Sequence, residues 1–276
     1  MGVLRRMGLR GTKISCQRAY ALIIGNGPSA MRDLQALGPR MDYDLWCVNG
    51  FALSEQYESL QPSHYVLADP AYWQSGNYQD LNDYIGKLLA RIQANTSWPM
   101  TLHLPLAARG QLRLRAIVNP LIQFRYFNNT SFTGSWAALR NWVYARELAM
   151  PAPQNVLIPS IYLATLAGYS RIEILGADHS WHRDIQVINS TLMLIERHFY
   201  DATTISKPFY KADGTVWLIA DIFAAWSLVH RQYYLLNAFS QYERVRIVNR
   251  TTGSFIDAFA AEPMCAASLE NPKPGT

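Results

Sequence analysis

The stretch ALIIGNGPSA, residues 21–30, carries the strongest fold signal in the chain. A short apolar run ends at two glycines separated by Asn26, and Pro28 and Ser29 follow. Glycine lets a backbone approach a ligand closely, and proline is favoured at the first position of a helix, where its missing amide has no helical partner to lose. The pattern therefore predicts a buried strand, a tight loop and a helix that begins near residue 29.

The same arrangement recurs along the chain, where a short apolar run ends in a cluster of polar or glycine residues. These runs end at Asn26, at Asn49 and Gly50, at Asp69 and Pro70, at Asp178 and His179, and at Asn249. The predicted helices lie at about residues 29–38, 51–60, 77–94, 135–149, 156–168, 189–200 and 216–239. Continuous runs of Val, Ile, Leu and Tyr are typical of strands buried on both faces. Their alternation with helices predicts an α/β, Rossmann-like fold with a mostly parallel sheet flanked by helices.

Length and composition favour a single large domain with short ends. The chain has 276 residues, of which 50% are hydrophobic, so it can bury a substantial core. We expect one Rossmann-like domain over residues 19–260, a basic flexible leader at 1–18 and a disordered tail at 261–276. Residues 201–215 lack hydrophobic periodicity and hold Pro208 and Gly214, so we predict a helical or loop lid over about 180–215.

The positive charge of the chain is concentrated at its start. The formal net charge is +5, and residues 1–18 hold five basic side chains and no acidic one, which leaves the rest formally neutral. We therefore expect no nucleic-acid partner, since such proteins need a basic patch within the fold. The leader is interpreted either as a solvated tail or as a peripheral contact with an anionic membrane.

Cysteine use and the apolar stretches indicate a cytoplasmic protein. The 3 cysteines lie far apart without a CxxC pair, which suits a reducing compartment and gives neither a disulfide framework nor a zinc site. Residues 1–18 lack the apolar core of a signal peptide. The longest apolar stretch, 216–229, is too short to span a bilayer. We expect the protein in the cytoplasm or at the inner face of the membrane.

The polar strand ends point to one ligand crevice. In parallel sheets this crevice lies outside the carboxyl ends of the strands, so we expect Asn26, Asn49, Asp69 and Asp178 to face it. Gly25, Gly27 and Ala30 match the dinucleotide pattern G-x-G-x-x-G/A. That fingerprint also needs an acidic residue about 20 positions later, where this chain has Asn49. The triplet DYD, 42–44, resembles a metal motif but precedes its strand, so we expect neither NAD(P) nor an obligatory metal.

The order of these motifs resembles a known family. The blocks IIGNGPS, CVNG and LADP, followed by SIYLATLAGYSRIEILGADHSW, are similar to bacterial CMP-sialic-acid-dependent sialyltransferases of glycosyltransferase family 42. The resemblance covers residues 20–75 and 155–185, with a weaker similarity at 245–260. The same blocks also resemble motility accessory proteins linked to nonulosonate transfer and an archaeal pterin diphosphokinase-like family.

The resemblance implies the donor, the acceptor and the residues that hold the nucleotide. The donor would be a CMP-activated acidic sugar, such as sialic acid, another nonulosonate or Kdo. The acceptor would be a surface glycan, free or lipid-linked. The implied chemistry is an inverting transfer with no obligatory metal and no other cofactor. Carried over by position, the nucleotide-binding residues are Gly25, Asn26, Gly27, Pro28, Ser29, Asn49, Asp69, Ser160, Tyr200 and Tyr210.

Such a transfer needs a general base, and histidine has a suitable ordinary pKa. The candidate bases are His179 at a strand end, His182 in the cluster DHSWHRD and His198 in the predicted lid, and Asp178 beside His179 is a further catalytic candidate. A metal site formed by Asp178, His179, His182 and Asp184 matches no strong spacing template. Two other functions remain open, namely a diphosphokinase-like phosphoryl transferase and a non-catalytic nucleotide-binding module.

Overall fold

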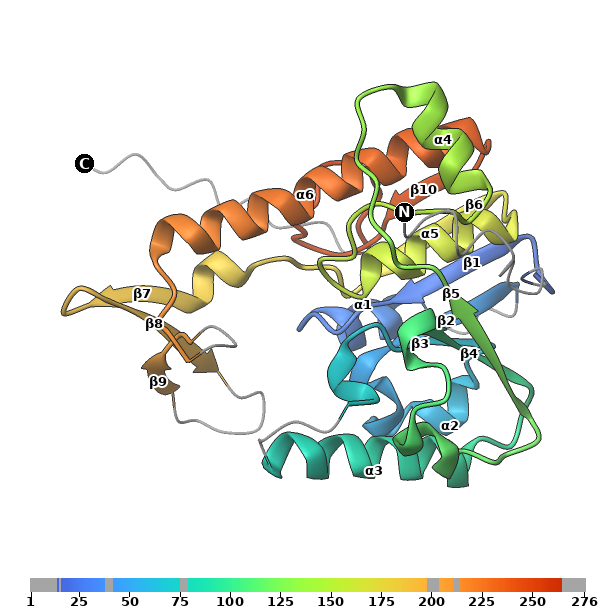
Figure 1. Ribbon diagram of the computed structural model, residues 1–276, viewed down its shortest axis with the longest axis horizontal. Coiled ribbons are helices and arrows are strands. Elements are labelled where there is room, and N and C mark those ends of the chain that lie inside the picture. Colours follow the sequence, from blue (N-terminus) through green and yellow to red (C-terminus); the bar gives the residue numbers. More distant parts are fainter. Residues whose placement is uncertain are drawn as a thin grey trace.

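The computed structural model describes residues 14, 16–37, 42–74, 79–197, 204–210 and 214–264. An eight-stranded sheet forms its centre, with the strand order β11-β10-β6-β1-β2-β3-β4-β5 and all of its strand pairs parallel (Figure 1). The strands are β1 (Tyr20–Ile24), β2 (Tyr43–Val48), β3 (His64–Val66), β4 (Met100–Pro105), β5 (Ile122–Phe127), β6 (Arg171–Leu175), β10 (Arg246–Asn249) and β11 (Ala260–Ala261). The predicted α/β fold with a mostly parallel sheet is confirmed.

Helices cover both faces of this sheet. They are α1 (Ala30–Leu37), α2 (Tyr57–Leu60), α3 (Gln79–Asn95), α4 (Ala137–Ala145), α5 (Leu157–Ala167) and α6 (Ile219–Tyr242). Along β1, Ala21 and Ile23 pack into the core formed with α4, α5 and α6, whereas Leu22 and Ile24 pack into the core with α1, α2 and α3. All four side chains are buried because both faces are covered, which explains the continuous apolar run.

A second, three-stranded antiparallel sheet occupies part of the predicted lid. It consists of β7 (Ile185–Ile188), β8 (Thr191–Arg197) and β9 (Thr204–Pro208). The prediction of a helix at 189–200 is wrong, because Asn189 and Ser190 have φ of 50° and 59° and Ile188 pairs with Thr191. Two successive residues with positive φ form the two-residue hairpin turn that joins antiparallel strands. Where it is described, the lid region is therefore largely β-structure rather than helix and loop.

Three strands of the sheet, β4, β5 and the two-residue β11, were absent from the sequence prediction. β4 and β5 carry His103 and Arg125 as buried side chains, so their sequences are not continuous apolar runs. Both side chains have polar partners inside the protein, since Nε2 of His103 lies 3.0 Å from Nδ1 of His64 and Arg125 pairs with Glu147 at 2.7 Å. The apolar criterion therefore missed strands whose interior holds a polar network.

The ends of the domain differ from the expected boundaries. Ile14 is buried, and the backbone amides of Gln17 and Arg18 donate to Asp44, so part of the predicted leader packs on the domain. The remainder of the leader and most of the tail lie outside the described residues. Among the helices that are described, none is both long and apolar enough to cross a membrane.

Candidate functional site

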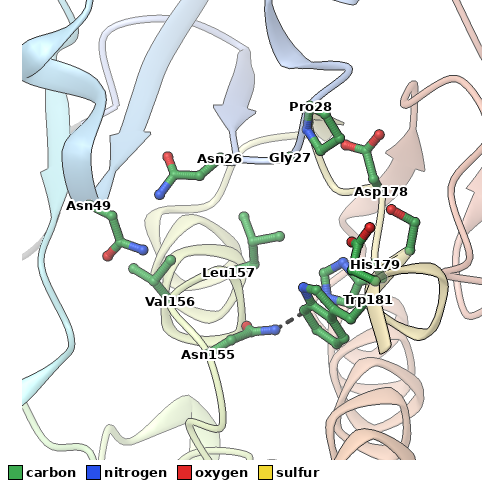
Figure 2. Close-up of a pocket in the computed structure, with 13 residues that line it drawn as sticks. Asn26, Gly27, Pro28, Asn49, Asn155, Val156, Leu157, Asp178, His179 and Trp181 are labelled. Atoms are coloured by element: carbon green, nitrogen blue, oxygen red, sulfur yellow. Dashed lines mark hydrogen bonds between the residues drawn. The ribbon is translucent and has the colours of Figure 1, made fainter. Parts of the chain in front are cut away.

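The candidate site is a cavity at the carboxyl ends of β1, β2 and β6. In the sheet, β1 has β2 on one side and β6 on the other, so the strand order reverses here. Open parallel sheets bind ligands at such a reversal. The cavity has a volume of about 370 Å³ and is lined by the loops after these three strands and by the start of α5 (Figure 2).

The glycines of the first loop allow two loops of the protein to approach each other. A Cβ atom on Gly25 would lie 2.5 Å from the carbonyl oxygen of Gly176, and one on Gly27 would lie 1.9 Å from Oδ2 of Asp178. The amides of Gly25 and Gly27 donate to the carbonyls of Leu175 and Gly176, each at 2.8 Å. These hydrogen bonds join the loop after β1 to the loop after β6. The two loops lie so close together that a side chain at residue 25 or 27 would clash with the loop after β6.

The carboxylate of Asp178, from the loop after β6, lies against the N-terminus of α1. Its carboxylate accepts from the hydroxyl of Ser29 at 2.9 Å and from the amide of Ser29 at 3.3 Å. Burial raises the pKa of this carboxyl, while the hydrogen bonds from Ser29 act in the opposite direction. The position that a phosphate takes in a dinucleotide enzyme is therefore filled by a side chain of the protein itself. This geometry, together with Asn49 at the end of β2, argues against the dinucleotide interpretation.

Three asparagine side chains stand around the cavity. Asn26 is exposed and forms no hydrogen bond to another described residue. Asn49 has a φ of 48°, and its carbonyl accepts from the Tyr65 hydroxyl at 2.5 Å, which fixes the residue. The Oδ1 atom of Asn49 is buried without a partner among the described residues. Asn155 lies just before the start of α5, and Figure 2 shows all three side chains around the cavity.

Asn155 was not among the predicted site residues. Its Oδ1 atom accepts from the amide of Ile158 at 3.2 Å, which is the interaction of a residue that begins a helix. Its Nδ2 atom lies 2.9 Å from the Tyr233 hydroxyl and 3.2 Å from Nε2 of His179. The sequence signal was available, because Asn155 lies just before the predicted helix at 156–168.

His179 lies in the cavity wall but is already hydrogen-bonded. Its Nε2 atom is 2.7 Å from the Tyr233 hydroxyl, and its backbone has a φ of 54°. Burial, with a smaller contribution from the neighbouring ring of His230, lowers the pKa of His179 to about 3. The ring is therefore neutral near pH 7, and both the Tyr233 hydroxyl and the Asn155 amide lie within hydrogen-bonding distance of Nε2. In this geometry His179 is held in the cavity wall. Its Nε2 atom is engaged with Tyr233 and Asn155 and is not free to take a proton from a substrate, as the predicted role as base requires.

Asp184 and Trp181 complete the wall beside His179. Asp184 ends the short helical turn Trp181–Asp184, lines the cavity and forms no hydrogen bond to another described residue. The ring of Trp181 lies 4.3 Å from that of His179, measured between ring centroids. Asp184 is thus a cavity carboxylate that is not hydrogen-bonded within the part of the chain that the structure describes.

Several predicted site residues lie elsewhere. Asp69 is exposed outside the cavity lining, where it accepts from the amide of Ala71. Ser160 is fully buried, and its hydroxyl donates to the Val156 carbonyl at 2.7 Å, so it supports the helix and does not reach the cavity. His182 is exposed and packs on Phe255. Tyr210 is exposed and outside the cavity lining, while His198 and Tyr200 lie outside the described residues.

Asp44 of the triplet DYD has a structural role. It accepts from the Tyr169 hydroxyl at 2.8 Å and from the amides of Gln17 and Arg18, near the start of β2 and away from the cavity. Across the described ranges, no group of three or more His, Cys, Asp or Glu side chains is arranged to hold a metal ion.

No family model, curated protein or solved structure matches this chain.

Proposed function

We propose that this protein is a glycosyltransferase that transfers an acidic sugar from a CMP-activated donor to a glycan acceptor. The observation that carries the proposal is the pair Asn26 and Asn49, which reach one cavity from the ends of two neighbouring strands. Both positions match the residues that contact the nucleotide in the family that the sequence resembles. The sugar would be sialic acid, another nonulosonate or Kdo, and the leader is proposed as a peripheral membrane contact.

The unpartnered Oδ1 atom of Asn49 supports a polar ligand. A buried acceptor without a partner costs about 1–3 kcal/mol, so a ligand that donates a hydrogen bond there gains affinity. An asparagine amide offers both donors and an acceptor, which suits the edge of a nucleobase or the hydroxyls of a ribose. The Asn26 amide stands free in the same cavity (Figure 2). These neutral groups suit the nucleoside part of the donor.

In the proposed reaction the acceptor hydroxyl attacks the anomeric carbon of the donor sugar. A new carbon–oxygen bond forms on one face as the bond to the phosphate oxygen breaks on the other, and CMP leaves with both electrons of that bond. The hydroxyl proton passes to a base. We assign this base to Asp184, because it lines the cavity with an unengaged carboxylate, whereas Asp178 and His179 are held by other residues.

A second candidate function is a nucleotide-binding module without catalysis. The engaged Nε2 atom of His179 and its lowered pKa favour this alternative, because they remove the strongest sequence candidate for a base. Such a module would keep the asparagine pair and bind CMP, but it would not cleave a CMP-sugar.

One experiment separates these functions. The melting temperature is measured with CMP, UMP, ATP and NAD, with and without EDTA, and the release of CMP from CMP-sialic acid and CMP-Kdo is followed in EDTA. The glycosyltransferase requires stabilisation by CMP and release of CMP from at least one donor. Stabilisation without release supports the binding module. If only ATP raises the melting temperature, and only when Mg²⁺ is present, both functions are rejected in favour of a phosphoryl transferase.

A further inference from the structure

A row of aromatic rings leads from the cavity to the surface. Trp181 lines the cavity, and its ring centroid lies 6.0 Å from that of Trp226 on α6. The Trp226 ring in turn lies 5.7 Å from the ring of Phe223, one turn earlier on the same helix. We call Trp181, Trp226 and Phe223 the aromatic row. It connects the proposed reaction site with the first turns of α6.

The outer end of the aromatic row is exposed. Phe223 is 51% exposed, while Trp181 and Trp226 are half-buried. Figure 1 shows that the first half of α6 extends beyond the central sheet. Burial of apolar side chains is favourable, so an exposed phenylalanine beside two tryptophans marks a surface that a ligand can cover.

The surroundings of the aromatic row suit a sugar ring. One face of a pyranose consists of C–H groups that pack on aromatic rings, and its edge carries hydroxyls that need polar partners. Asp184 and Ser180 line the cavity beside Trp181 and provide such partners. Binding sites for small molecules combine apolar and aromatic walls with a few polar groups in this way.

The charges near the aromatic row do not suit an anionic membrane. In the start of α6 that carries Phe223 and Trp226, residues 219–228, Asp221 is the only charged side chain, and the turn that carries Trp181 holds one arginine and one aspartate, Arg183 and Asp184. Association with anionic lipids is strengthened by lysine and arginine near the surface, at about 1 kcal/mol each. A neutral sugar has no such requirement.

We infer that the aromatic row binds a neutral sugar ring of the acceptor glycan and directs its hydroxyl toward the cavity. The role as acceptor site rests on the proposed glycosyltransferase function. The binding of a sugar ring by these three side chains does not, and it is measurable without a donor.

The test uses saturation-transfer NMR of the full chain with lactose, maltose and cellobiose, each with and without CMP. Wild type is compared with Phe223→Ala and Trp226→Ala. The matched control is Trp136→Ala, because Trp136 is 70% exposed and lies just before α4, outside the aromatic row. Melting temperature, oligomeric state and CMP affinity are measured for each variant, so that loss of folding is distinguished from loss of binding.

We expect at least one disaccharide to bind wild type and the control. The dissociation constant should rise about tenfold in Phe223→Ala and in Trp226→Ala, as for the loss of one aromatic contact, with CMP affinity unchanged. The inference is overturned if wild type binds none of the sugars or if both variants bind as well as wild type does. It is also overturned if Phe223→Ala dissociates an oligomer or abolishes binding to anionic vesicles. Sugar binding without CMP binding would reject the proposed function and retain the sugar surface.

Discussion

The carboxylate of Asp178, at the end of β6, accepts hydrogen bonds from the hydroxyl and the amide of Ser29, which lies 149 residues earlier at the start of α1. This contact joins the two loops that form one wall of the cavity. It also places a negative side chain where a helix start would otherwise attract the phosphate of a ligand. In the proposed function, nucleotide recognition would therefore depend on the asparagine amides rather than on the glycine loop.

Replacement of Asp178 by alanine should lower the free energy of unfolding by about 1–3 kcal/mol, because the Ser29 amide and hydroxyl lose their buried acceptor. Urea denaturation at pH 7 measures this change. Asp69→Ala is the matched control, since Asp69 also caps a helical turn but is exposed, so that water replaces it. The control should change the unfolding free energy by at most about 0.5 kcal/mol. Equal effects at the two positions would contradict the assigned role of Asp178.

Gly27→Ala should destabilise the protein by about 1–3 kcal/mol, because the new methyl group would overlap Oδ2 of Asp178 and lie 2.6 Å from the Gly176 carbonyl. Gly86→Ala is the matched control. Gly86 lies inside α3 with open space around its Cβ position, so alanine should stabilise the helix by about 0.5–1 kcal/mol. The two variants should shift the urea midpoint in opposite directions, and a shift in the same direction would contradict the close approach of the two loops.

Acid should destabilise the protein through its buried histidines. Burial lowers the pKa of His64 to about 4 and that of His179 to about 3, from an ordinary value of 6.5. The unfolded chain takes up these protons as the pH falls through 6.5, whereas the folded chain does not until about 4 or 3. Because the unfolded state binds more protons, the unfolding free energy should fall by about 1.4 kcal/mol per pH unit for each histidine.

Urea denaturation between pH 7 and pH 4.5 measures this slope. His179→Gln should reduce the slope by the share of one histidine. An unfolding free energy that stays constant over this range, in wild type and variant alike, would show that the two rings are not held neutral by the fold.

Sequence reasoning located the strand ends because local chemistry fixes them. The apolar runs before Asn26, Asn49 and Asp178 are buried on both faces, and parallel strands bring their carboxyl ends to one edge of the sheet. The same reasoning placed His179 at the cavity. It could not foresee that Tyr233, from a helix 54 residues later, would engage Nε2, because that contact depends on tertiary packing.

The failures of the prediction share one physical cause. Arg125 and His103 interrupt the apolar patterns of β5 and β4, yet partners from other elements allow their burial. The turn at Asn189 and Ser190 lies inside a sequence that also suits a helix, and only the pairing of β7 with β8 decides for a hairpin. The sequence pattern linked Gly25 and Gly27 to a bound ligand, whereas in the structure the two glycines lie against the loop after β6. Each outcome depends on a partner distant in the sequence.

Asp184→Asn should separate catalysis from binding. If Asp184 takes the proton of the acceptor hydroxyl, its loss should reduce kcat for CMP release from the active donor by about 10²-fold or more and leave CMP affinity unchanged. His179→Gln should have a smaller effect on kcat, because His179 is engaged with Tyr233. A variant at Asp184 with the rate of wild type would move the base to another residue, and His198→Gln is then the next variant to assay.

The central claim is that Asn26 and Asn49 hold the nucleotide of a CMP-activated donor. Calorimetric titration of CMP, in the presence of EDTA, into wild type, Asn26→Ala and Asp69→Ala tests it most directly. Asn26 is exposed and forms no hydrogen bond to another described residue, so its replacement should leave the melting temperature unchanged. We predict that CMP binds wild type and Asp69→Ala alike, and that the dissociation constant rises about tenfold in Asn26→Ala through loss of hydrogen bonds. Absence of CMP binding, or equal affinity in wild type and Asn26→Ala, would contradict the account.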